Sequence, residues 1–241
     1  LDWAPALAVL AATTIVIGNV GAIAQRSLKR MLAWSSVAQA GYLLVPLGVA
    51  STDPTDAVLG QALSATVAYV CIYAVVNLGA FGVVAVVSRH RPAGLLSDYR
   101  GLMRTEPGSA IMLAFFLLCL AGLPPGLAGL FAKVVVFEAA VSGGLGWLAV
   151  VMAVNTVIAL AYYLYWIALL FAAPGQPVAV GGTADVDEPA EMLVEAAAPP
   201  SYRVPGASAA ALGVLLAAPL VLSVLPQLVL NLVPDVSGII G

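Results

Sequence analysis

The sequence predicts an all-α fold, a polytopic membrane bundle of six transmembrane helices, from its composition and its long apolar runs. Of the 241 residues, 62% are hydrophobic and only 9% are charged, and the mean hydropathy is +1.06. A soluble domain has about a quarter of its residues charged. A chain with so few charges cannot cover a globular surface with polar side chains, which excludes a soluble enzyme, a nucleic-acid-binding protein and a disordered linker.

Six apolar runs are long enough to cross a membrane, because a helix needs about 20 residues to span roughly 30 Å of hydrocarbon. Hydrocarbon offers no partner for backbone polar groups, and a helix satisfies these groups within one segment. We therefore expect one helix in each run. The runs cover residues 3–24, 31–50, 57–87, 108–141, 146–172 and 206–232.

The loops between these runs differ in charge, which predicts the orientation of the chain. Loops 51–56 and 142–144 contain no Lys or Arg. By the positive-inside rule the basic loops face the cytoplasm, so both ends of the chain are expected on the outer side of the cell inner (plasma) membrane. The basic loop residues are Arg26, Lys29, Arg30, Arg89, Arg91, Arg100, Arg104 and Arg203.

The loop 173–205 has a different composition from the rest of the chain. It is rich in Pro, Asp and Glu, and such a segment cannot bury a core. We expect a solvated cytoplasmic connection, with a docking strip for a basic partner as the alternative. The predicted organisation is therefore a five-helix unit over 1–172, this acidic loop, and a terminal helix with the C-terminus over 206–241.

The fourth run is predicted to be a discontinuous helix. As one helix, residues 108–141 would be about 51 Å long, too long for one untilted crossing. Its middle, residues 121–129, contains Pro124 and Pro125, which remove two amide donors, and Gly122 and Gly126, which permit a change of backbone direction. Broken helices of this kind mark ion and substrate sites in transporters.

Lys133 lies two turns after this break and is the only basic residue away from the loops. A charged lysine at bilayer depth costs about 3 kcal/mol on insertion scales and usually faces a cavity or a partner. We interpret Lys133 as a proton-exchanging residue, the alternative being a snorkelling or passively paired lysine. Glu138 is roughly 140° further around a regular helix, which makes it a poor partner for Lys133 on the same helix. We expect it toward the outer interface, as a candidate for the proton path.

Polar residues follow one face of the third run. Such a face in lipid indicates either hydrogen bonds between helices or a hydrated path. The second and fifth runs carry similar faces. The three sets are Thr66, Tyr69, Tyr73 and Asn77; Ser35, Gln39 and Tyr42; and Asn155, Tyr162 and Trp166.

Several segments together resemble one known family. Residues 18–42 read GNVGAIAQRSLKRMLAWSSVAQAGY, residues 77–82 NLGAFG, residues 98–102 DYRGL and residues 120–125 LAGLPP, followed by Lys133. In this order they are similar to the second half of the proton-translocating, antiporter-like membrane subunits of respiratory complex I. Ala132 departs from the pattern, because the family usually has glycine before the lysine.

The resemblance implies a fold and a role. The six helices would be the second inverted repeat and the terminal helix of the family, and Lys133 would be its essential lysine in the discontinuous helix. A lysine at this position favours subunit N. The nearest rival is the D-type member of multi-subunit sodium/proton antiporters, and a non-transporting membrane scaffold is a third possibility.

The same resemblance implies that the chain moves protons while other subunits carry the redox chemistry. NADH, flavin, iron–sulfur clusters and quinone are expected in those subunits, and no cofactor or metal is expected in this chain. Its two cysteines, Cys71 and Cys119, have no metal-ligand spacing. The expected partners are the other membrane-arm subunits, the lipid bilayer and protons, and no nucleic acid.

Overall fold

The computed structural model describes residues 3–50, 56–91, 94–173 and 206–224. Within these ranges every regular element is a helix, apart from one isolated bridge between Ser27 and Leu95. The long helices are α1 (Ala4–Ile23), α2 (Leu28–Ala50), α3 (Asp56–Val87), α6 (Pro107–Ala121), α7 (Leu127–Ser142), α8 (Gly146–Phe171) and α9 (Gly206–Val224), and the short ones are α4 (Leu96–Tyr99) and α5 (Leu102–Thr105).

The prediction of an all-α membrane protein is confirmed for the described part of the chain. Four segments there are long and apolar enough to cross a membrane, and two shorter helices are also apolar, Pro107–Ala121 and Ala210–Val224. The predicted run 108–141 corresponds to two helices, α6 and α7. The four segments are Ala4–Ile23, Leu28–Val49, Ala62–Val87 and Gly146–Phe171.

Two predicted segments lie partly or almost wholly outside the described residues. The last predicted run, 206–232, is described only as far as Val224, where α9 ends. Of the acidic loop 173–205, only residue 173 is described.

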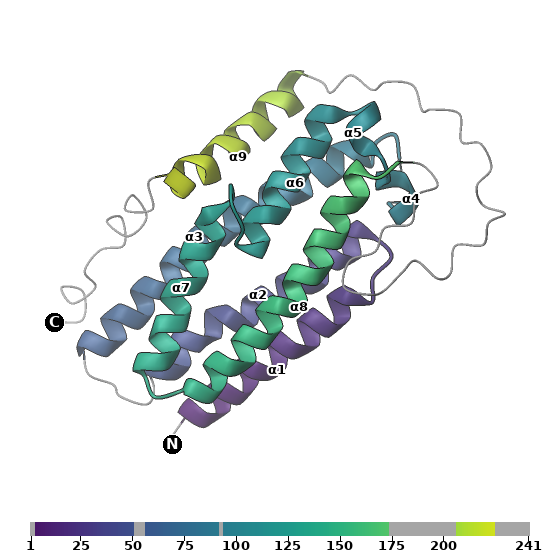
Figure 1. Ribbon diagram of the computed structural model, residues 1–241. Coiled ribbons are helices and arrows are strands. Elements are labelled where there is room, and N and C mark those ends of the chain that lie inside the picture. Colours follow the sequence, from purple (N-terminus) through teal and green to yellow (C-terminus); the bar gives the residue numbers. More distant parts are fainter. Residues whose placement is uncertain (1–2, 51–55, 92–93, 174–205, 225–241) are drawn as a thin grey trace.

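The helices form an elongated bundle in which the connections gather at its two ends (Figure 1). The α1–α2 turn, the short helices α4 and α5, and the C-terminal end of α8 lie at one end, and the α7–α8 turn lies at the other. Backbone hydrogen bonds join the segments at the first of these ends. The Leu96 amide donates to the Arg26 carbonyl at 3.2 Å, and the Gly101 amide donates to the Leu169 carbonyl at 3.0 Å. The two predicted cytoplasmic loops that fall within the described residues, after α1 and after α3, therefore share one end of the molecule.

Close packing of α1 against α2 depends on small residues. A Cβ atom added at Gly41 would lie 2.6 Å from Ile15 Cγ1 and 2.9 Å from the Ala11 carbonyl oxygen. Those distances are too short for any side chain, so the two backbones approach each other more closely than larger residues allow. This approach holds α2, which carries Gln39, firmly in place.

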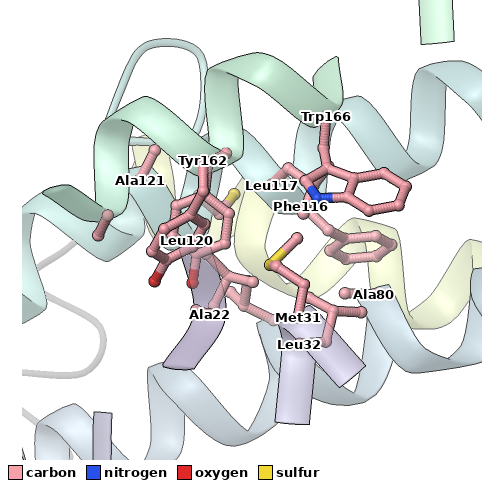
Figure 2. Close-up of a cluster of buried hydrophobic side chains, with 14 of the residues drawn as sticks. Ala22, Met31, Leu32, Ala80, Phe116, Leu117, Leu120, Ala121, Tyr162 and Trp166 are labelled. Atoms are coloured by element: carbon pink, nitrogen blue, oxygen red, sulfur yellow. The ribbon is translucent and has the colours of Figure 1, made fainter. Parts of the chain in front are cut away.

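A cluster of buried hydrophobic side chains fills the bundle between α2, α6 and α8 (Figure 2). Met31, Leu32, Phe116, Leu117 and Trp166 are all at most 1% exposed. Phe116 lies about one turn before the end of α6, which is at the α6–α7 junction, and Trp166 lies about one turn before the end of α8, which is at the loop end. The cluster therefore lies between the junction and the loop end.

A buried ion cluster secures the loop end of α6. Glu106 immediately precedes the helix, and its carboxylate lies 2.6 Å from His90 Nε2 and 3.7 Å from Arg91 Nη2. Ser109 Oγ donates to the same carboxylate at 3.3 Å, and Arg91 Nη2 donates to Thr105 Oγ1 at 2.7 Å. An anion at a helix N-terminus is favourable, and this cluster ties α5 and α6 to the end of α3.

Candidate functional site

The candidate site is built around the junction of α6 and α7. Helix α6 ends at Ala121, and Gly122 caps it in the left-handed conformation at φ 83°. The Gly122 and Leu123 amides both donate to the Leu118 carbonyl, at 2.9 and 3.0 Å. This arrangement is typical of a glycine-terminated helix. Pro124 and Pro125 follow, both exposed, and α7 begins at Leu127.

The first turn of α7 lies directly against the last turns of α6. A Cβ atom at Gly126 would lie 2.5 Å from the Cys119 amide nitrogen, and one at Gly129 would overlap the Cys119 carbonyl oxygen. Only glycine fits at these two positions. Ala132, where the family pattern has glycine, is accommodated with 5% exposure one turn further along.

Lys133 is buried in α7, and its ammonium group reaches back to the end of α6. Nζ donates to the Leu120 carbonyl at 3.0 Å and to the Ala121 carbonyl at 3.1 Å. These carbonyls belong to the last turn of α6, the negative end of its macrodipole, which favours a cation. Within the described residues Lys133 forms no ion pair with a carboxylate, so its charge is balanced by backbone dipoles.

A small cavity of about 20 Å³ adjoins Lys133, and its lining comes from α2, α3, α6 and α7. That volume is enough for a water molecule. The cavity brings two residues of the predicted α3 stripe to Lys133. The polar side chains in its lining, besides Lys133 itself, are those of Gln39, Tyr69 and Tyr73.

The four stripe residues of α3 are placed differently. Tyr69 donates to Gln39 Oε1, and within the described residues Tyr73 Oη is buried without a hydrogen-bond partner. Asn77 Nδ2 donates to Ser36 Oγ of α2 at 3.3 Å. Thr66 donates to the carbonyl of Ala62 in its own helix at 2.9 Å and does not line the cavity.

Glu138 and Lys133 are not brought together. Glu138 is exposed on α7 and does not line the cavity.

The polar face of α2 divides between two neighbours. Gln39 faces the Lys133 cavity, whereas Ser35 hydrogen-bonds Tyr163 of α8 and the Tyr42 hydroxyl lies 3.0 Å from Thr156 Oγ1. These last two contacts fasten α2 to α8.

The polar face of α8 serves chiefly to hold helices together. Asn19 Nδ2 of α1 donates to Asn155 Oδ1 at 3.3 Å, and Tyr162 donates to Asn19 Oδ1 at 3.0 Å. Trp166, predicted on the same face, instead joins the apolar cluster, where its ring centroid lies 6.0 Å from that of Tyr99.

Two features of the site were not predicted from the sequence. The partners of Lys133 are backbone carbonyls, which any residue type could supply. Ser223 of α9 accepts a hydrogen bond from the Ala128 amide of α7 at 3.1 Å, and no spacing in the sequence connects these residues. Within the described residues no group of three His, Cys, Asp or Glu side chains could hold a metal ion.

Comparisons with known proteins place this geometry in context. Residues 1–159 match the family model described as "NADH:quinone oxidoreductase/Mrp antiporter, TM". The chain is 55% identical over 235 residues to NADH-quinone oxidoreductase subunit N 2 of Streptomyces griseus, covering 95% of this chain and 42% of that protein. It is 48% identical over 171 residues to NADH-quinone oxidoreductase subunit N of Salinispora tropica, covering 68% of this chain and 33% of that protein. The chain thus spans less than half the length of these curated relatives.

Two solved structures share the fold. A chain of respiratory complex I from Thermus thermophilus is 28% identical with a TM-score of 0.71, covering 96% of this chain and 46% of that one. A chain of the Mrp complex from Dietzia sp. is 23% identical with a TM-score of 0.76, covering 98% of this chain and 47% of that one; this second likeness concerns the fold alone.

Proposed function

The chain belongs to the NADH:quinone oxidoreductase/Mrp antiporter transmembrane family, and from this premise we propose that it acts as proton-translocating subunit N in the membrane arm of an NADH–quinone oxidoreductase. The observation that carries the proposal is the burial of Lys133 at the junction of two half-helices, beside a small and mostly apolar cavity to which Gln39, Tyr69 and Tyr73 contribute. The 55% identity to a subunit N supports it. NADH, flavin, iron–sulfur clusters and quinone then belong to other subunits of the assembly.

In this proposal the chain crosses the cell inner membrane six times, and α6 and α7 together form one discontinuous crossing. The basic loops face the cytoplasm, and both ends of the chain lie on the outer side. The clustering of the α1–α2 turn with α4 and α5 at one end of the bundle supports this arrangement. Non-helical backbone at membrane depth must be covered by protein or line a cavity, and the buried Gly122 and Gly126 meet this condition within the chain, whereas the exposed Pro124 and Pro125 would be covered by a neighbouring subunit.

Lys133 carries the proton in this mechanism. Its ammonium group has three N–H donors, and two of them are taken by the Leu120 and Ala121 carbonyls. The third donor is available to a water molecule in the adjoining cavity. When Lys133 gives this proton to the water, the neutral amine keeps two N–H groups, and these still donate to the two carbonyls. Its lone pair then points to the water and can accept a proton from it.

The proton path continues along α3. Tyr69 and Tyr73 line the cavity and are the first stations for a water-mediated relay, while Asn77 lies toward the cytoplasmic side. Thr66 and the exposed Glu138 lie toward the outer side in the proposed orientation and mark the exit. The apolar cluster around Phe116 and Trp166 fills the space between α2, α6 and α8, so the relay follows the α3 stripe and is gated by charge changes in the neighbouring part of the assembly.

A sodium/proton antiporter component of the D type is the second candidate, supported by the fold shared with the Mrp complex. In such a protein the same cavity would exchange protons for sodium without redox chemistry. Sodium-driven proton movement in vesicles lacking NADH would favour it over subunit N. A non-transporting scaffold is the third candidate, in which Lys133 serves only to join α6 to α7.

The test is a Lys133→Ala substitution in the full complex, assayed in membrane vesicles for protons moved per NADH oxidised. Proton transfer through this helix should fall by about 10²-fold, the range typical for a lost acid–base group, while the complex still assembles. The matched control is Lys29→Ala, which removes an exposed lysine in the first turn of α2 and should leave pumping unchanged. Full pumping by the Lys133→Ala complex would leave the scaffold as the better description.

A further inference from the structure

We propose that Ser223 of α9 is a positioning residue for Lys133, because it caps the N-terminus of α7 from a different helix. This inference rests on the proposed function of Lys133 and adds a residue to it. Ser223 Oγ accepts a hydrogen bond from the Ala128 amide at 3.1 Å. Ala128 is fully buried and Ser223 is 9% exposed, so water competes little for this contact.

The first turn of an α-helix leaves backbone amides without partners inside the helix. Most helices satisfy one of them with a Ser, Thr, Asp or Asn side chain at the N-cap position. In α7 the N-cap is Gly126, which has no side chain to offer. The nearby Gly129 amide uses the Gly126 carbonyl at 3.3 Å, which leaves the Ala128 amide to Ser223.

A capping side chain cannot be placed at Gly126 itself. A Cβ atom there would lie 2.5 Å from the amide nitrogen of Cys119 and 2.6 Å from its Cα. Both atoms belong to the backbone of α6, which cannot move aside without opening the junction. The close contact between Gly126 and Cys119, which brings Lys133 to the end of α6, therefore excludes a capping side chain at Gly126. The capping hydroxyl comes from Ser223 of α9 instead.

The geometry of α9 orients the Ser223 hydroxyl for this task. The hydroxyl donates to the Pro219 carbonyl one turn earlier at 2.7 Å. Its proton is thus engaged, and its oxygen is left to accept from Ala128. Helix α9 packs against α3 and α7 and lies along the side of the bundle where the α6–α7 junction is found (Figure 1).

The cap matters for Lys133 because α7 is a short, stiff element. Lys133 lies five residues after Ala128, less than two turns away. Its two hydrogen bonds cross from α7 to the Leu120 and Ala121 carbonyls of α6. A movement of the first turn of α7 changes these distances directly, so Ser223 acts on proton transfer through the placement of Lys133.

The experiment compares Ser223→Ala and Ser223→Thr in the intact complex by hydrogen–deuterium exchange of peptides covering residues 123–132. Ser223→Ala should speed exchange there by about five- to tenfold, the range expected for a lost cap, and should lower the protons moved per NADH oxidised. Ser223→Thr keeps the hydroxyl and should restore both readouts. The matched control is Ser142→Ala at the opposite, exposed end of α7, which should change neither.

Unchanged exchange in Ser223→Ala would overturn the cap, and faster exchange with unchanged pumping would overturn its role in positioning Lys133. If Ser223→Ala does not assemble, Ser223→Cys keeps the side-chain volume but has only a weak acceptor, and the same two outcomes apply to it. A failure of the proposed function is distinguishable from a failure of this inference. Full pumping by Lys133→Ala would contradict the proposed function, whereas the hydrogen–deuterium exchange of Ser223→Ala tests the cap whatever the pumping result is.

Discussion

Lys133 and Leu120, which lie on two different helices, are joined by a hydrogen bond of 3.0 Å from the lysine Nζ to the leucine carbonyl oxygen. The bond crosses the gap between α7 and α6, so the ammonium group sits where the partial negative charge of α6 is greatest. Among the described residues this buried charge has no carboxylate partner, which is unusual in a structural role, since such charges are generally paired. Backbone dipoles can hold a cation without neutralising it, which suits a group that gains and loses a proton.

Gly129→Ala should separate the two half-helices. Its Cβ would overlap the Cys119 carbonyl oxygen, and such overpacking costs about 1–3 kcal/mol. We expect a lower melting temperature of the purified complex and reduced proton pumping. Gly108→Ala is the control, because a Cβ there meets nothing within 4 Å. Equal melting temperatures for the two variants would mean that α6 and α7 are not in close contact.

Tyr73→Phe should lower pumping while leaving stability unchanged. Within the described residues the Tyr73 hydroxyl has no hydrogen-bond partner of good geometry, so we expect its removal to cost little stability, but it takes away a polar group that lines the cavity beside Lys133. Tyr69→Phe differs, because it leaves Gln39 Oε1 without its donor and should cost about 1 kcal/mol of stability. The readouts are pumping per NADH and thermal unfolding. Wild-type pumping by Tyr73→Phe would remove this residue from the proton path.

Glu106→Gln should loosen the loop end of the bundle. The substitution removes the charge that faces His90 and Arg91, and breaking a buried pair by removing one partner costs about 3–5 kcal/mol. Limited proteolysis of the loop between α3 and α6 should accelerate. Arg104→Gln, at an exposed position of the same loop, serves as the comparison. Equal cleavage rates for both variants would show that the ion cluster does not stabilise the loop end of the bundle.

Sequence patterns predicted the elements of the site better than the contacts between them. Apolar runs marked the helices, and Pro124 and Pro125 marked the junction between α6 and α7, because these signals are local. The face of α3 was also predictable, but the roles of its residues were not. Helical periodicity gives the side of a helix and not the rotamer, so Thr66 bonds its own backbone while Tyr69 reaches Gln39.

The partners of Lys133 and the cap from Ser223 could not be predicted for a different reason. Every residue carries a backbone carbonyl, so residue types in a sequence do not indicate which carbonyls accept hydrogen bonds from Lys133. The contact between Ser223 and Ala128 spans 95 positions and depends on how α9 packs against α7. Contacts of this kind follow from tertiary packing, which the single sequence does not encode in any local pattern.

The most direct test of the central claim is the Lys133→Arg substitution in the full complex, measured as protons moved per NADH oxidised in sealed vesicles. Arginine keeps the positive charge and the capacity to bond the Leu120 and Ala121 carbonyls, but it does not release its proton at physiological pH. If Lys133 carries protons, the arginine complex should pump as poorly as Lys133→Ala while still oxidising NADH. Wild-type pumping by Lys133→Arg would mean that the charge alone is required, and it would contradict a proton-carrying role for Lys133.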